Sequence, residues 1–319
     1  MNLIDVTREL ATDEQCLAFL EHQRWPDGIV RCPTCGNDQI SRITRKTASK
    51  NKRAQVYQCL ESTCKQQFSA TNGSIFHDSH LPLNKWFMAI ALVMDAKKGI
   101  SAKQLQQHLG IGSYKTAWYM CHRIRKAMVD ADPTPLSGVV EIDETYIGGN
   151  AIRRFQKTPK PRPPKDMVLA MRERSTKDKP GRVRYFHVPD GKLETLKPIV
   201  EANVADFPSM KIYTDSSSVY DIMFGKGPRE QSHRMVNHSR EWVVPGSRIH
   251  TNTVESSFSL LKRGLIGSFH RVSIKHLHRY LTEFEYRFNQ RKADDRFTMT
   301  VAAMLRGKPM PFKQLVSEA

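Results

Sequence analysis

The sequence has no long apolar run and few cysteines. Its most apolar stretch, residues 86–94, is far shorter than the roughly 20 residues that cross a bilayer, so we expect no membrane contact. No basic start followed by an apolar segment is visible near Met1, so we expect no secretory signal peptide. Six cysteines in a chain of 319 residues are too few for a disulfide-stapled secreted domain. We therefore expect an intracellular protein.

Acidic residues are scarce relative to basic ones. The chain has 50 Lys and Arg against 32 Asp and Glu, which gives a formal charge of +18. A protein this basic is typically bound to a polyanion, and nucleic acid is the first candidate. A basic surface that serves only solubility is the alternative. With 39% hydrophobic and 26% charged residues, the chain can build a core, and its length predicts about two domains.

Four of the six cysteines form two close pairs. Two residues separate Cys32 from Cys35, and four separate Cys59 from Cys64. Thiolates at such spacings can bind a tetrahedral ion, so they predict a structural Zn²⁺ site of four sulfurs in a zinc ribbon. A closed site of this kind leaves no open position for chemistry. Four reduced structural thiols are the alternative. The polar, basic segment 39–58 between the pairs is expected to form an exposed hairpin.

Helical periodicity dominates the rest of the first 131 residues. We expect one helix over residues 5–22 with Leu10, Cys16, Leu17 and Leu20 buried, and a second over residues 82–94. Two short helices around a glycine turn at residues 110–113 predict a helix-turn-helix. The second of them carries polar and basic side chains that we expect to face DNA: Lys115, His122, Arg123, Arg125 and Lys126. An ordinary helical pair with a solvated basic face is the alternative.

The turn-rich segment 132–138 is the expected domain boundary, because the pattern then changes to mixed strands and helices. Strands are expected at residues 139–147, 167–171, 183–188, 210–215 and 233–237. Helices are expected at residues 192–204, around residues 252–265, and at 274–290. The proline-rich basic segment 153–165 is expected to be a loop that either contacts phosphates or is a solvated linker.

Three acidic residues stand at informative places in this half. Asp143 lies in a strand of branched apolar residues, and Asp215 ends a later strand. Glu255 shares one helix face with Asn252, Ser259 and Lys262. A carboxylate at the end of a buried strand is costly unless it is paired or holds a metal.

The ordered motifs resemble insertion-sequence DDE transposases of the ISXO-like type, which carry an amino-terminal zinc ribbon. The segments that carry the resemblance are the four cysteines, residues 68–71 and 74–77, 115–118 and 122–125, 141–146, 213–215, and 250–264. The resemblance implies an α/β fold, namely an RNase H-like (retroviral integrase-type) catalytic domain preceded by a zinc ribbon and a helix-turn-helix-like helical region.

The resemblance also implies the site. Asp143 and Asp215 would be the first two catalytic acids and Glu255 the third, holding two Mg²⁺ (or Mn²⁺) ions. Asn252 is the alternative third ligand, because some members of the family use asparagine. Lys262 matches the basic residue that commonly follows the third acid.

Neighbouring residues complete the expected site. We expect Lys262 and the adjacent Arg263 to contact the DNA backbone, as Lys115, Arg123 and Arg125 would in the helical region. Glu141 and Glu144 rank lower, since Glu144 should point to the other face of the strand.

The expected activity is metal-dependent DNA cleavage and strand transfer by a transposase. Its partners would be the terminal inverted repeats of a transposon and target DNA, bound as a homo-oligomer in the bacterial cytoplasm at the nucleoid. A catalytically inactive DNA-binding derivative and a structure-selective RNase H-like nuclease are the alternatives. The expected domains are an N-terminal helical segment (1–24), the zinc ribbon (25–78), the helix-turn-helix region (79–131), the catalytic domain (137–292) and a C-terminal tail (293–319).

Overall fold

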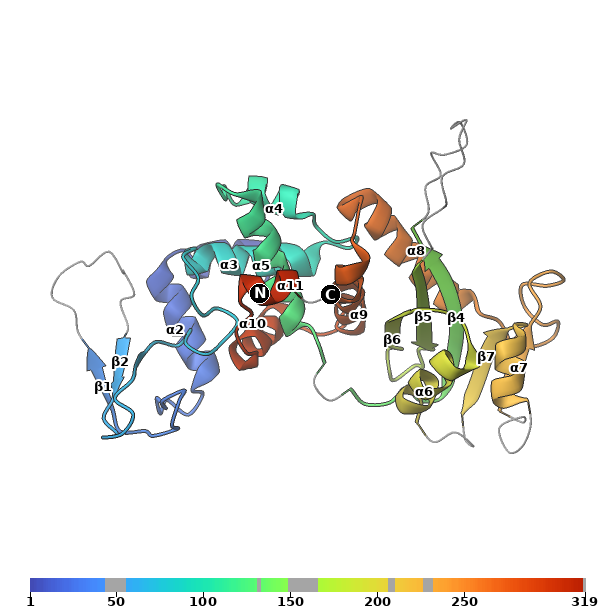
Figure 1. Cartoon of the computed structure of the whole chain (residues 1–319), viewed down its shortest axis with the longest axis horizontal. Coiled ribbons are helices and arrows are strands. Elements are labelled where there is room, and N and C mark those ends of the chain that lie inside the picture. The colour runs from blue at the N-terminus through green and yellow to red at the C-terminus, as the bar shows by residue number, and fades with distance from the viewer. Residues whose placement is uncertain (44–55, 131–132, 149–165, 206–209, 226–231, 318–319) are drawn as a thin grey trace. The chain divides into compact units, whose positions relative to one another are not determined.

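The structure is a computed structural model that describes residues 1–43, 56–130, 133–148, 166–205, 210–225 and 232–317. Most of the connection expected as a hairpin (44–55) and the whole basic segment 153–165 lie outside the described residues. The chain divides into two compact units (Figure 1). The first contains residues 1–129 and 293–319, and the second contains residues 130–292.

The first unit begins with two helices where the sequence predicted one. They are α1 (Leu3–Glu9) and α2 (Asp13–Arg24). A new helix begins after Thr12 because Thr12 forms a capping box with Gln15, in which the Thr12 side chain accepts the N–H of Gln15. The four residues predicted to be buried here are buried: Leu10, Cys16, Leu17 and Leu20.

The predicted zinc ribbon is a three-stranded antiparallel sheet. Its strands β1 (Ile40–Ile43), β2 (Val56–Cys59) and β3 (Gln67–Phe68) follow that order across the sheet. Such a small sheet buries little apolar area, so aromatic side chains supply most of its packing. The rings of Trp25, Tyr57 and Phe68 lie 5.7 to 6.3 Å apart between centroids.

Five more helices among the described residues belong to the first unit. They are α3 (Leu83–Asp95), α4 (Ala102–His108), α5 (Tyr114–Ala127), α10 (Arg296–Arg306) and α11 (Phe312–Ser317). Residues 293–319, predicted as a tail, instead contain α10 and α11 and belong to this unit. The reason is the apolar face of α10, whose Phe297 meets Phe87 of α3 at 5.6 Å between ring centroids.

The second unit contains a mixed five-stranded sheet of order β6-β5-β4-β7-β8 (Figure 1). The strands are β4 (Val139–Ile147), β5 (Asp166–Glu173), β6 (Val183–Val188), β7 (Lys211–Asp215) and β8 (His233–Val236), close to the predicted ranges. β4, β5 and β6 form an antiparallel meander, whereas β7 pairs parallel with β4 and with β8. The chain reaches β7 through the crossover helix α6 (Leu193–Asn203).

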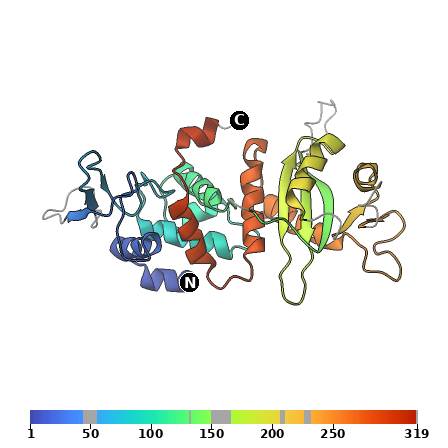
Figure 2. The ribbon, with the colours of Figure 1, turned by 90° about the horizontal axis from the view of Figure 1, so that it is seen from below.

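Helices cover both faces of this sheet (Figure 2). One face packs Val140 and Ile142 against α6 and α7 (Ser218–Phe224). The other face packs Val168 and Ala170 against α8 (Asn252–Gly264) and α9 (Ile274–Asn289). Between α8 and α9 the chain makes a π-helical turn, η3 (Leu265–Phe269). Because successive strand residues point to opposite faces, this assignment fixes the direction of every side chain of β4.

Side chains of α9 close the β6 edge of the sheet. The Asn289 amide accepts the N–H of Val183 at 2.8 Å and donates to its carbonyl at 3.0 Å. Glu285 accepts the N–H of Tyr185 at 3.1 Å. These bonds occupy backbone groups that would otherwise be open to another strand. In the described part of the chain, no helix is long and apolar enough to cross a membrane.

Candidate active site

The four paired cysteines come together at the end of the ribbon. Their sulfurs all lie within 4.8 Å of one another, with 3.7 Å between Cys32 and Cys64 and 3.5 Å between Cys35 and Cys59. A tetrahedral zinc ion with Zn–S bonds of about 2.3 Å places its sulfurs about 3.8 Å apart, so the cluster fits this ion. All four thiols are free of disulfides.

The local backbone prepares this cluster for a cation. Gly36 follows Cys35 with φ +78°, a left-handed conformation that completes the tight turn. Burial raises the pKa of the Cys32 thiol, but hydrogen bonds from the N–H groups of Cys35 and Thr34 outweigh it and lower the pKa to about 7. Cys32 is therefore the thiol that ionises most readily, whereas burial and contacts with the neighbouring thiols raise the pKa of Cys59 to about 12 in the metal-free cluster.

The three predicted acids lie on one face of the second sheet. Glu141 of β4 is paired with Tyr213 of the parallel strand β7, so continuing the register by two residues places Asp143 beside Asp215. Asp143 is opposite Ala170, whose side chain belongs to the cluster packed under α8. Glu255 lies in the first turn of α8. Two adjacent strands and one covering helix thus supply the three carboxylates.

Electrostatics shows that these carboxylates act on one another. Burial is the largest cause that raises the pKa of Asp143 to about 7, and the charge of Asp215 is the second. The charges of Glu144 and Glu255 raise it further, while a hydrogen bond from the Glu144 N–H at 2.8 Å opposes them. A cation bound beside Asp143 would be favoured, because it would offset the repulsion between these carboxylates.

Ligand distance is a stricter test than electrostatic range. Within the described ranges, the four cysteines form the one group of three or more His, Cys, Asp or Glu whose ligand atoms converge closely enough to hold a metal. The carboxylates of Asp143, Asp215 and Glu255 stand further apart than that. The three acids therefore share one face of the sheet, but their oxygens do not converge to the distances of a single metal site.

Two side chains hold the Glu255 carboxylate. The hydroxyl of Thr251 donates to Glu255 Oε1 at 3.0 Å, and His238 Nε2 lies 3.2 Å from the same oxygen. His238 also bonds the Thr251 hydroxyl at 2.7 Å. Asn252, the alternative ligand, is exposed at the first residue of α8. No pattern in the sequence points to His238, which lies two residues after β8 and outside α8.

The other two acids of β4 serve different purposes. Glu144 points to the α7 face, as predicted, and accepts a hydrogen bond from the Tyr220 hydroxyl. Burial raises the pKa of Glu144 to about 7. Glu141, which we ranked low from the sequence, is fully buried on the face of Asp143. It accepts hydrogen bonds from Arg174 at 2.5 Å and from the N–H groups of Thr253 and Val254.

The predicted DNA-binding residues fall into two groups. Lys115 and Arg263 are exposed, and Lys262 lies half-buried on α8 two turns from Glu255. Arg123 is only 3% exposed, which argues against the DNA contact predicted for it. Its guanidinium donates to the carbonyls of Ile75 and His77, so it fastens α5 to the segment before α3. Arg125 is also 3% exposed, so its burial argues against a DNA contact in the same way.

Comparison with known proteins places these features in a family context. Residues 135–289 match the model of the ISXO2-like transposase domain, and residues 11–67 match that of the transposase zinc-ribbon domain. An uncharacterized protein in transposable element ISH50 of Halobacterium salinarum is 28% identical over 298 residues, which cover 88% of this chain and 92% of the relative. An uncharacterized transposase-like protein of Haemophilus influenzae is 32% identical over 102 residues, which cover 32% of this chain and 76% of the relative. No solved structure matches the chain.

Proposed function

The chain belongs to the ISXO2-like family of insertion-sequence transposases, and on that premise we propose that it is a DDE-type enzyme that cleaves DNA at transposon ends and joins them to target DNA. The observation that carries this proposal is the gathering of Asp143, Asp215 and Glu255 on one face, where the latter two raise the pKa of the first. The sheet order β6-β5-β4-β7-β8, with its antiparallel meander and parallel β7 and β8, supports an RNase H-like catalytic domain.

The donor set fits divalent metal ions. Carboxylate oxygens are the ligands that Mg²⁺ and Mn²⁺ prefer, and a cation would relieve the repulsion that acts on Asp143. Asp143, Asp215 and Glu255 would hold two such ions. When bound, the ions lower the pKa of water and stabilise the charge on the reacting phosphate.

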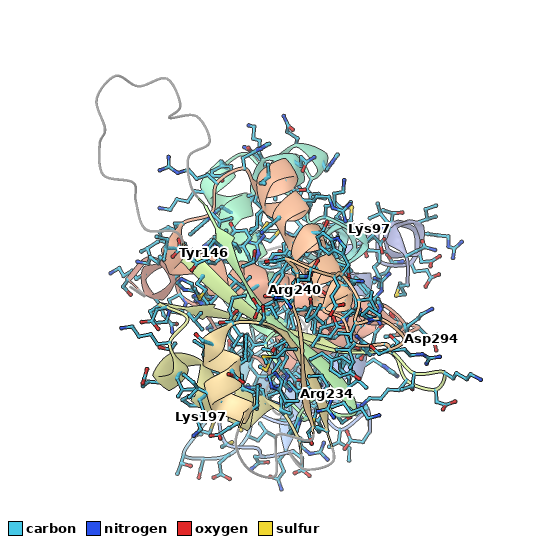
Figure 3. The ribbon with its side chains drawn as sticks, turned by 90° about the vertical axis from the view of Figure 1, so that its right-hand side faces the viewer. Lys97, Tyr146, Lys197, Arg234, Arg240 and Asp294 are labelled. Carbon is cyan, nitrogen blue, oxygen red and sulfur yellow. The ribbon has the colours of Figure 1, made fainter. Side chains whose placement is uncertain are left out.

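The chain's own side chains position the reactants. His238 and Thr251 orient Glu255, since both contact its Oε1. Lys262, which has no ion pair among the described residues, would approach a phosphate beside the acids, and Arg263 would bind the backbone next to it. Arg234 on β8 and Arg240 after it are also exposed on this unit (Figure 3).

The proposed chemistry has two steps. In the first, the oxygen of water attacks a backbone phosphorus, the P–O3′ bond breaks, and the element retains a free 3′-hydroxyl. In the second, that hydroxyl attacks a phosphorus of the target strand, a new P–O bond forms, and the target's own 3′-oxygen leaves. No covalent bond between protein and DNA is needed. The zinc ribbon and the α4–α5 pair, with Lys115 exposed, would bind the terminal repeats, and the two ends would be brought together by a homo-oligomer.

The decisive experiment uses the full chain with its flanking genomic DNA ends and Mg²⁺. We expect Asp143→Asn and Asp215→Asn each to abolish strand cleavage while leaving end binding in a gel-shift assay within about twofold of wild type. A cleavage rate near that of the wild type in either variant would contradict the assignment. Strand transfer of a defined end separates a transposase from a structure-selective nuclease. Binding without any cleavage by the wild type would identify an inactive DNA-binding derivative.

The third acid has its own comparison. The charge of Glu255 acts on Asp143, whereas Asn252 is exposed. We therefore expect Glu255→Gln to stop cleavage and Asn252→Ala to slow it only slightly. Both variants are assayed with the same DNA end and Mg²⁺ concentration. The reverse result would transfer the role to Asn252.

A further inference from the structure

The first turn of α8 is capped by a side chain from the sheet. The residue at the usual capping position, Thr251, makes no side-chain cap hydrogen bond, and its hydroxyl donates to Glu255 at 3.0 Å. Instead, Glu141 Oε2 accepts the N–H of Thr253 at 2.8 Å and that of Val254 at 2.9 Å. The Glu141 carboxylate of β4 therefore caps α8, a role that the residue just before a helix usually has.

This cap ties two distant parts of the chain together. The first N–H groups of a helix have no partner within it, and a negative charge beside them is stabilised by the helix dipole. Glu141 meets both needs from 112 and 113 residues earlier in the chain. Because the carboxylate is completely buried, it can adopt few positions, and the helix end is fixed on the strand.

Arg174 reinforces the cap from the next strand. It directly follows β5, and its Nε donates to the other oxygen of Glu141 at 2.5 Å. The same guanidinium donates to the carbonyls of Arg248 at 2.7 Å and His250 at 2.9 Å, in the segment that leads into α8. It also lies 4.8 Å from the ring centroid of Tyr213 in β7. Glu141 of β4, Tyr213 of β7 and Arg174 just after β5 thus meet near the start of α8.

We propose that Glu141 is a positioning residue which, together with Arg174, fixes the first turn of α8 and thereby sets where the Glu255 carboxylate stands relative to Asp143. Glu141 precedes Asp143 by two residues on the same face of β4, and Glu255 directly follows Val254, which Glu141 holds. One buried side chain connects the strand of the first acid to the helical turn of the third. This inference rests on the proposed role of these acids as cation ligands.

A matched control is available on the neighbouring strand. Glu173 at the end of β5 is also buried and paired with an arginine, Arg182, at 2.9 Å. Its other partners are Ser137 and Lys179, and among the described residues it has no hydrogen bond or ion pair with α8. Glu173→Gln removes a buried charge in the same unit, so it reproduces the general cost of the substitution without touching the helix cap.

The test measures Mn²⁺ binding by calorimetry on the zinc-loaded full chain without DNA, and hydrogen exchange of the peptide covering residues 250–262. Outer-shell partners of metal ligands typically change affinity by about 10- to 100-fold, so we expect Glu141→Gln to weaken Mn²⁺ binding at least about tenfold. We also expect faster exchange at Thr253 and Val254. Glu173→Gln should leave both readouts within about twofold of wild type. Should Glu141→Gln fail to fold, Glu141→Asp keeps the charge, reaches less far and should give an intermediate loss.

The outcomes separate this inference from the proposed function. Asp143→Asn defines the Mn²⁺ binding that belongs to the acids. If the wild type and Asp143→Asn bind Mn²⁺ identically, the proposed cation site is wrong. If Asp143→Asn abolishes binding but Glu141→Gln binds as the wild type does, only the positioning role is overturned. Equal losses in Glu141→Gln and Glu173→Gln would also overturn it, because they would show a general effect of a buried charge.

Discussion

Replacing Asp143 by Asn should inactivate the protein and stabilise it when no divalent ion has been added. Burial and the charge of Asp215 raise the pKa of Asp143 to about 7 in the folded protein, whereas its ordinary value is 3.8. The folded state therefore binds the proton more strongly than the unfolded state. Stability falls as pH rises from about 4 to about 7, and the loss stays constant above that.

The size of the effect follows from the pKa difference. At about 1.4 kcal/mol for each pH unit, the step from 3.8 to about 7 gives an upper bound of about 4 kcal/mol. Asp143 is partly exposed, so solvent screening reduces this to about 1–3 kcal/mol. Asparagine keeps the oxygen that accepts the Glu144 N–H and cannot ionise. Any cost of its buried amide is the same at every pH and cancels between two pH values.

The assay is thermal unfolding of the full zinc-loaded chain at pH 5 and pH 8 without Mg²⁺. For a unit of this size, 1 kcal/mol corresponds to about 2–4 °C. About three-fifths of the loss falls above pH 5, so we expect the Tm of Asp143→Asn relative to the wild type to be about 1–7 °C higher at pH 8 than at pH 5. Asp178→Asn, an exposed acid in the same unit, is the control and should change little. A relative Tm that is equal at the two pH values would refute the reasoning.

Three further predictions concern structure outside the acids. Asn289→Ala removes both hydrogen bonds to Val183 and should lower the free energy of unfolding of the second unit by about 1–3 kcal/mol, measured in urea. A change below about 0.3 kcal/mol would show that water replaces these bonds. Cys35→Ser should reduce bound zinc, measured by mass spectrometry of the metal, and lower the Tm of the first unit; unchanged zinc would exclude the four-sulfur site. Arg123→Met should destabilise the first unit by about 2–4 kcal/mol without changing the salt dependence of DNA binding. Lys115→Ala should reduce that salt dependence and cost only about 0.5–1 kcal/mol of stability, from the contact of its ammonium with the Phe312 ring.

Local patterns predicted much of this architecture because their physical causes are local. Alternating and branched apolar residues predicted β4, and helical periodicity predicted α3, α5 and α9. The spacing of Cys32 and Cys35 predicted the convergence of the four sulfurs. The break between α1 and α2 was also local: Thr12 and Gln15 form a capping box that the apolar periodicity obscured.

Other features depend on residues far apart in the sequence. Arg123 has the spacing of a solvent-facing basic residue, but the carbonyls of Ile75 and His77, nearly 50 residues earlier, hold it inside the first unit. Similarly, α10 has an ordinary amphipathic pattern, and no pattern in it reveals that it packs with helices near the other end of the chain.

The sequence alone determined the family, the two cysteine pairs and the strand and helix that carry Asp143 and Glu255, because spacing and periodicity are properties of neighbouring residues. Only the tertiary structure decided the role of Glu141. In the sequence it is one acid among three in a short stretch. In the fold it is buried, and it caps a helix that begins more than 100 residues later. A cap of this kind has no local pattern, since its donors and its acceptor meet only when α8 packs on the sheet.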